Sequence, residues 1–114
     1  MSKHHTINYI EFPASNLAIV RKFYEAAFGW TFTEYGPEYV AFNDGNIDGG
    51  FTEGAVAEAS GPLVILYSDD LEASLDTVVA AGGMIVKPIY EFPGGKRFHF
   101  ADPAGNVLAI WSDT

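Results

Sequence analysis

A repeat that divides the chain into two similar halves constrains the fold more than any other feature of the sequence. In each half a short apolar run leads to a polar residue, then to apolar residues at helical spacing, and then to glycine. The polar residues Asn16 and Asp70 are 54 positions apart, and so are Gly29 and Gly83. Asn and Asp are favourable N-caps, and glycine favours the left-handed conformation that ends a helix. The repeat therefore predicts two helices, one ended by Gly29 and the other by Gly83.

Short runs of aromatic and β-branched residues follow each helix, separated by turn-forming residues. Two hairpins are predicted: residues 39–42 and 47 onward around the turn 43–46, and residues 96–101 and 107–112 around the turn 102–106. With the strands that flank each helix, each half is expected to be a βαβββ unit.

The two units predict an α+β fold in which residues 1–114 form a single domain. Repeat one spans residues 5–56 and repeat two spans residues 61–114, and a segment of Ala, Glu, Ser, Gly and Pro joins them near residues 55–62. A four-stranded sheet with one helix on one face leaves its other face exposed. We therefore expect the repeats to form one curved mixed sheet around a concave cleft, where a ligand would bind.

The composition narrows the class of partner. Fifteen acidic residues against six basic ones give a formal net charge of −9, which disfavours nucleic acid and anionic membrane surfaces as partners. The absence of cysteine removes disulfides and thiolate chemistry and fits a cytoplasmic protein. No segment approaches the roughly 20 apolar residues that span a bilayer, and the first residues lack the apolar core of a secretory signal. A small organic molecule is the expected partner.

Four motifs in this order and spacing carry a resemblance to a known family. They are the run 7–13 (Ile-Asn-Tyr-Ile-Glu-Phe-Pro), Asn16-Leu17 followed by 23–30 (Phe-Tyr-Glu-Ala-Ala-Phe-Gly-Trp), Asp69-Asp70-Leu71, and 100–106 (Phe-Ala-Asp-Pro-Ala-Gly-Asn). Over nearly its whole length the chain resembles the vicinal oxygen chelate superfamily, which holds glyoxalases, bleomycin and fosfomycin resistance proteins, methylmalonyl-CoA epimerases and extradiol dioxygenases. The resemblance implies the glyoxalase/bleomycin resistance/dihydroxybiphenyl dioxygenase fold and a homodimer.

In metal-dependent members of that family, His and Glu side chains at four concave-face positions hold a divalent ion. The resemblance places these positions on Tyr9, on Gly49 or Gly50, on Leu63 and on Ala109. Zinc, nickel or iron ions need imidazole or carboxylate donors, which these residues do not supply. We therefore expect no metal at the usual positions and no cofactor. A displaced divalent-metal site made by His99, Glu11 and Asp48 stays open, although nothing in their spacing demands it.

Strand alternation predicts which side chains replace the ligands in the cleft. Tyr9 and Glu11 share one face of the first strand, while Tyr67 and Trp111 occupy the corresponding faces of two strands in the second repeat. If Ala101 pairs with Val107 across the last turn, His99 lies opposite Ala109 and Arg97 lies opposite Trp111. The candidate ligand-binding residues are Tyr9, Tyr67, Arg97 and Trp111.

The candidate catalytic residues are His99 and Glu11. Histidine titrates near neutral pH, so His99 could act as a general base with Glu11 orienting its ring. The alternative is a hydrogen-bonded structural histidine in a sheet. Residues 90–96 form either a lid over the cleft or a plain surface loop. Turn and cap chemistry explains the acidic pairs Asp44/Asp48 and Asp69/Asp70 better than catalysis does.

The resulting functional hypothesis is a glyoxalase-like protein that binds a small molecule in a cleft without the usual metal ligands. The alternative is a lyase, isomerase or dioxygenase-type enzyme that uses His99 or a non-standard metal site. A third hypothesis assigns the cleft to dimer packing. The net charge favours a cationic ligand, whereas Arg97 favours an anionic group.

Overall fold

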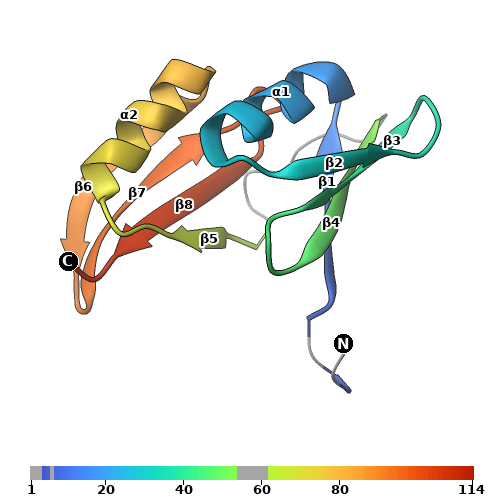
Figure 1. Cartoon of the computed structure of the whole chain (residues 1–114). Helices are drawn as coiled ribbons and strands as arrows, with labels where there is room; N and C mark the ends of the chain where they lie inside the picture. The colour runs from blue at the N-terminus through green and yellow to red at the C-terminus, as the bar shows by residue number, and fades with distance from the viewer. Residues whose placement is uncertain (1–3, 6, 54–61) are drawn as a thin grey trace. The chain divides into compact units, whose positions relative to one another are not determined.

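The computed structural model describes residues 4, 5, 7–53 and 62–114, and the chain separates into two compact units, Met1–Ala57 and Glu58–Thr114. Each unit holds four strands and one helix (Figure 1). The first contains β1 (Tyr9–Ala14), α1 (Leu17–Phe28), β2 (Thr31–Glu34), β3 (Tyr39–Asn43) and β4 (Asp48–Glu53). The second contains β5 (Val64–Tyr67), α2 (Leu71–Ala81), β6 (Met84–Phe92), β7 (Gly95–Ala101) and β8 (Val107–Ser112). The two predicted βαβββ repeats are confirmed.

The strand order is the same in both units. The first sheet runs β1-β4-β3-β2 and the second β5-β8-β7-β6, with the first pair parallel and the others antiparallel in each. The hydrogen-bonded strands therefore make two four-stranded mixed sheets where we expected one curved sheet. The segment predicted to join the repeats falls largely on residues 54–61, which lie outside the described residues. The shared concave cleft stays a prediction.

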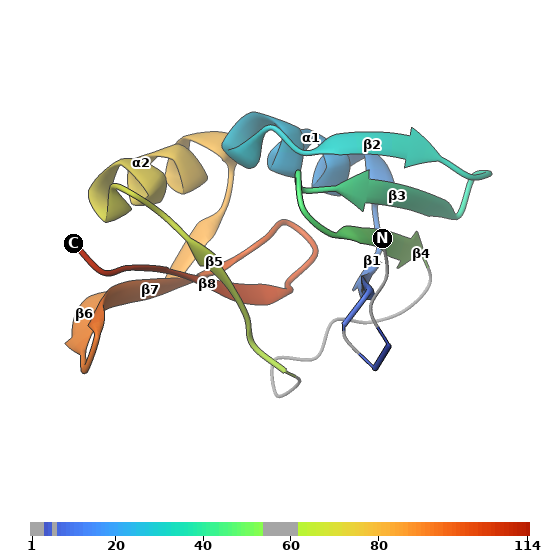
Figure 2. The same ribbon diagram turned by 60° about the horizontal axis from the view of Figure 1, so that its bottom comes forward.

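Each helix covers one face of its own sheet (Figures 1 and 2). In the first unit the space between helix and sheet is filled by aromatic rings. Tyr24 stacks on Trp30 with ring centroids 4.5 Å apart, Trp30 stacks on Phe42 at 4.6 Å, and Phe51 lies 5.3 Å from Phe12. Burying one such side chain contributes about 1.5–3 kcal/mol. No helix in the described part of the chain is long and apolar enough to cross a membrane.

The helix N-caps are those that the sequence predicts. The side chain of Asn16 accepts a hydrogen bond from the backbone N–H of Ile19 at 3.1 Å, and that of Asp70 accepts one from Ala73 at 3.2 Å. Gly29 ends α1 with φ 71°, as expected.

The C-cap of α2 was predicted one residue too late. Gly82, with φ 107°, is the left-handed residue, and the N–H of Gly83 already bonds to the carbonyl of Val78 at 2.9 Å. Because Gly82 and Gly83 are adjacent glycines, either could adopt the conformation, and the repeat spacing pointed to the wrong one. Helix α2 is consequently 11 residues long, against 12 for α1.

The segment 90–96 is a β-hairpin, so its interpretation as an irregular stretch was wrong, while its role as a lid stays a prediction. Strand β6 runs through Phe92, which pairs with Gly95, the first residue of β7. Gly94 supplies the positive φ of the turn. The pairing continues through Glu91 with Lys96 and Tyr90 with Arg97, which satisfies the backbone of the segment.

Candidate functional site

The exposed face of the first sheet carries the residues that the alternation of β1 predicts. Tyr9 and Glu11 of β1 are exposed, while Phe12 of the same strand is buried. In the parallel pairing Tyr9 lies opposite Asp48, and Glu11 lies opposite Gly50. Gly50 in turn lies opposite Ala41 of β3, so Glu11, Gly50 and Ala41 lie on the same face of the sheet.

The two glycines of β4 face opposite sides of the sheet. A Cβ on Gly49 would collide with the ring of Phe42 in the core, whereas a Cβ on Gly50 would collide with the ring of Tyr39 on the exposed face. In the second sheet Ala109 pairs with Ile65 as Gly50 pairs with Glu11, in agreement with the offset of the repeat. Gly50, and not Gly49, is therefore the counterpart of Ala109.

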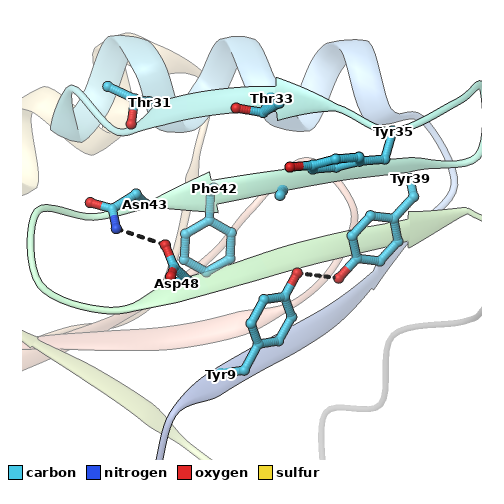
Figure 3. A pocket seen from close by; sticks show the side chains of 9 residues that line it. Tyr9, Thr31, Thr33, Tyr35, Tyr39, Phe42, Asn43 and Asp48 are labelled. Atoms are coloured by element: carbon cyan, nitrogen blue, oxygen red, sulfur yellow. Dashed lines mark hydrogen bonds between the residues drawn. The ribbon is translucent and has the colours of Figure 1, made fainter. Parts of the chain in front are cut away.

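A pair of tyrosines covers Gly50. The phenol of Tyr39 lies over this glycine, and its hydroxyl is 2.6 Å from the hydroxyl of Tyr9 on β1 (Figure 3). Burial raises the pKa of Tyr39, and hydrogen bonding with Tyr9 and with Glu11 raises it further. The phenol of Tyr39 is therefore held as a neutral hydrogen-bonding group.

The residues at the family's four ligand positions do not fit a divalent metal ion. Leu63 and Ala109 carry no donor atom, and Gly50 has no side chain. Tyr9 has a phenol oxygen, but it is hydrogen-bonded to Tyr39. Within residues 4, 5, 7–53 and 62–114 no group of three His, Cys, Asp or Glu side chains could hold a metal ion.

A hollow of about 440 Å³ opens beside the tyrosine pair on the same face. Figure 3 shows the hydroxyls of Tyr9 and Tyr39 directed toward each other on one side of it, and Asn43 beside Asp48 on the other. The Asn43 amide donates to the Asp48 carboxylate at 2.8 Å. The lining residues are uncharged apart from one carboxylate: Tyr9, Thr31, Thr33, Tyr35, Tyr39, Ala41, Phe42, Asn43 and Asp48.

The exposed face of the second sheet brings three of the predicted ligand-binding residues into one row. The predicted register is confirmed: Ala101 pairs with Val107, and Arg97 lies opposite Trp111, which lies opposite Tyr67 of β5. The rings of Tyr67 and Trp111 meet edge to face with centroids 5.2 Å apart. Tyr67 donates to the Asp113 carboxylate at 2.7 Å, and this hydrogen bond raises the pKa of Tyr67.

His99 lies in the next row, opposite Ala109 as predicted, and its hydrogen-bond partner is Tyr90. The distance from His99 Nε2 to the Tyr90 hydroxyl is 3.0 Å, and Arg97 Nε donates to the same hydroxyl. Partial burial lowers the pKa of His99, and the positive charges of Arg97 and Lys87 lower it further. In the second unit His99 is thus a hydrogen-bonded sheet histidine whose surroundings favour the neutral imidazole. Its predicted partnership with Glu11 stays a prediction.

Reasoning from the sequence missed Tyr39, Tyr90 and Lys87 as site residues. Two adjacent glycines inside a strand signal a close approach, and this signal could have pointed to a ring over Gly50. Lys87 and Tyr90 are an odd number of residues apart, so regular alternation separates them. Register shifts in β6 around Pro88 let them face His99 and Arg97, which share one face of β7.

Comparisons with known proteins agree with this fold. The chain is 23% identical over 127 residues to the protein named "Putative glyoxylase CFP32" of Mycobacterium bovis and of Mycobacterium tuberculosis, with 93% of this chain covered. It spans 45% of the length of these relatives.

Two solved structures have closely similar folds. A glyoxalase/bleomycin resistance protein/dioxygenase family enzyme from Burkholderia phytofirmans has a TM-score of 0.82 at 18% identity, with 94% of this chain and 98% of that chain covered. The fosfomycin resistance protein FosX from Listeria monocytogenes, in complex with Mn(II) and dihydroxypropylphosphonic acid, has a TM-score of 0.84 at 15% identity, with 98% and 93% covered.

The family model described as the Glyoxalase/Bleomycin resistance protein/Dioxygenase superfamily matches residues 6–110. With the repeated βαβββ topology, this match shows that the chain belongs to that superfamily.

Proposed function

We propose that this protein binds a small organic molecule in the hollow of the first repeat, without a metal ion at the family's ligand positions. The observation that supports this most strongly is the Tyr39 phenol, which fills the space above Gly50 and is hydrogen-bonded to Tyr9. A ligand side chain on Gly50 would need that space. The phenol pair instead offers hydroxyl groups to the hollow.

The lining favours a neutral or cationic ligand with several hydrogen-bonding groups. Threonine and tyrosine hydroxyls can donate or accept, and the faces of tyrosine rings attract cations. Asp48 is the charged group among the lining residues. An ammonium group on the ligand can therefore pair with the Asp48 carboxylate, whereas a ligand carboxylate has no cationic side chain among the lining residues to pair with. A volume of about 440 Å³ suits a drug-sized molecule or smaller.

A ligand screen with a variant that fills the hollow tests this function. Ligand-observed NMR with a fragment library, in buffer containing a chelator, should find binders among neutral and amine compounds. Ala41→Phe should abolish their binding, because Ala41 lines the hollow. Ala26→Phe, on the exposed side of α1, is the matched control and should leave binding unchanged. Binding that requires an added divalent metal, or that survives Ala41→Phe, would contradict the proposal.

A second candidate function is an isomerase- or lyase-type enzyme in which His99 removes a proton from a bound substrate. The lowered pKa of His99 favours it, because a neutral imidazole can accept a proton at pH 7. Such a base would exchange a carbon-bound proton of the substrate with solvent. Deuterium incorporation into added carbonyl compounds in D₂O should then occur, and His99→Gln should abolish it while His4→Gln should not. No incorporation in the unaltered protein would eliminate this candidate.

The homodimer that the family resemblance implies also belongs to the proposal. Strand β6 is an edge of the second sheet, and its side chains Met84 and Val86 are 69% and 52% exposed. An exposed apolar edge strand favours pairing with another chain. Light scattering at several dilutions should detect a dimer, and a monomer at every concentration would refute it.

A further inference from the structure

Two basic side chains on the exposed face of the second sheet have no acidic partner among the described residues. In the described part of the chain the ion pairs involve Arg21, which contacts Glu25 and Glu34, and Lys96, which lies 3.8 Å from Glu72. Neither Lys87 nor Arg97 forms an ion pair with the acidic residues that the structure describes. Their charges are therefore available to a ligand.

One tyrosine holds both of these basic side chains in place. Lys87 Nζ lies 4.2 Å from the centroid of the Tyr90 ring, and Arg97 Nε donates to the Tyr90 hydroxyl. The guanidinium carbon of Arg97 is also 5.5 Å from the Tyr90 ring and 5.4 Å from the ring of Phe92. Within the described residues, the remaining N–H groups of Arg97 have no hydrogen-bond acceptor. A planar fork of donors is thus fixed before any ligand arrives, which reduces the entropy lost on binding.

The neighbouring His99 lies beside both of these basic side chains. The charged and titratable groups that face it are Lys87 and Tyr90 from β6 and Arg97 from its own strand. Strand β8 contributes Ala109 opposite His99 and adds no charge. Among the described residues, the groups that lower the pKa of His99 by their charge are Arg97 and Lys87, and both are positive.

We propose that Lys87, Arg97 and the Tyr90 that carries them form a binding site for an oxyanion group, a carboxylate or a phosphate, on a small molecule. Arginine binds both groups through paired N–H donors, and lysine adds a second point charge. Phe92 and Trp111, whose rings are 6.3 Å apart, border Arg97 and offer apolar contact to the rest of the ligand. The residues of this site belong to the second unit, whereas the hollow is lined by residues of the first unit, none of which is basic.

The imidazole of His99 is the probe for a direct test. Its NMR signals, assigned by comparison with His99→Gln, are followed against pH in the presence of inorganic phosphate in one series and of acetate in another. An oxyanion bound between Lys87 and Arg97 should raise the pKa of His99 by on the order of one unit, with a saturable concentration dependence. Saturation by phosphate, by acetate or by both identifies the group that the site accepts.

Two variants and a control decide whether the shift comes from this site. The double variant Lys87→Gln with Arg97→Gln should lose the anion-induced shift, whereas Lys22→Gln, on the exposed side of α1, should keep it. Circular dichroism verifies that the double variant is folded. The proposal fails if neither anion gives a saturable shift or if the folded double variant keeps it. Ala41→Phe, which should abolish ligand binding in the first-repeat hollow, should leave the anion-induced shift of His99 unchanged. Failure of the oxyanion site and failure of the proposed first-repeat function can therefore be distinguished.

Discussion

The phenol of Tyr39 lies over Gly50, in the space that any side chain at that position would need. The two positions are coupled, because a side chain at position 50 would displace the Tyr39 ring. The hydrogen bond between Tyr39 and Tyr9 therefore depends on glycine at position 50. Tyr9 and Gly50 stand at two of the positions where the resemblance implies metal ligands, and here the phenols of Tyr9 and Tyr39 form a hydrogen bond beside Gly50.

Gly50→Ala should lower the free energy of unfolding by about 0.5–1.5 kcal/mol, because the new Cβ displaces Tyr39 and breaks its hydrogen bond to Tyr9. In a Tyr39→Ala background the same change should cost much less, since nothing then occupies the space. Urea unfolding of the four proteins in this double-mutant cycle measures the coupling. Additive effects would show that the ring and the glycine are independent.

The stability of the protein should fall in alkaline solution partly through Tyr39. Its pKa in the folded state is raised above the unfolded value of about 10. The contribution is therefore fully present below pH 10 and is lost as the pH rises through the folded pKa. Tyr39→Phe should flatten the loss of unfolding free energy above pH 10, and Tyr35→Phe, on the same face, should not. Equal profiles for the two variants would contradict the assignment.

His99 should contribute to the loss of stability on the acid side. Its pKa in the folded state is lowered below the unfolded value of about 6.5, so its contribution is present above pH 6.5 and is lost as the pH falls through the folded pKa. His99→Gln should reduce this loss. Arg97→Gln should reduce it only in part, because burial is the largest cause of the shift. Denaturant unfolding between pH 7 and pH 5 measures the unfolding free energy as a function of pH. If it falls with pH as steeply in His99→Gln as in the unaltered protein, His99 does not make this contribution.

The end of α2 distinguishes two adjacent glycines. Gly82→Ala should lower the free energy of unfolding by about 1–2 kcal/mol, because alanine resists the left-handed conformation at φ 107°. Gly83→Ala should have a much smaller effect, since Gly83 is not among the glycines with positive φ. Thermal unfolding of both variants measures the difference. A larger destabilisation by Gly83→Ala than by Gly82→Ala would show that Gly83 is the C-cap.

Local signals in the sequence were sufficient for the architecture. Caps at Asn16 and Asp70 and the turn 102–106 are specified by residues close together in the chain. The Asp102 carboxylate accepts from the backbone N–H groups of Ala104 and Asn106 at 2.9 Å, and this turn fixes the pairing that places His99 opposite Ala109. Asp44 likewise accepts from the N–H groups that follow it, as the assignment of acidic residues to turns predicts.

The site was less accessible because it depends on side chains that cross strands. Tyr39 reaches diagonally over β4 to Tyr9, and no local pattern specifies that reach. Tyr90 faces the same side as Lys87 only because the register of β6 shifts, which reverses the parity that alternation assumes. The opposing indications of net charge and Arg97 fall on different units of the chain. Asp48 lines the hollow of the first unit, while Lys87 and Arg97 contact the same Tyr90 ring in the second.

The most direct test of the central claim is metal binding by the protein purified without chelators. Elemental analysis followed by calorimetric titration with Mn²⁺, Ni²⁺ and Zn²⁺ should show no stoichiometric site in a background that carries His4→Ala and His5→Ala. The triple variant Tyr9→His, Gly50→Glu and Tyr39→Ala, which places an imidazole and a carboxylate on adjacent strands, should gain affinity for these ions. A stoichiometric metal ion in the unaltered site, lost on Tyr9→Phe, would contradict the proposal that no metal ion binds at these positions.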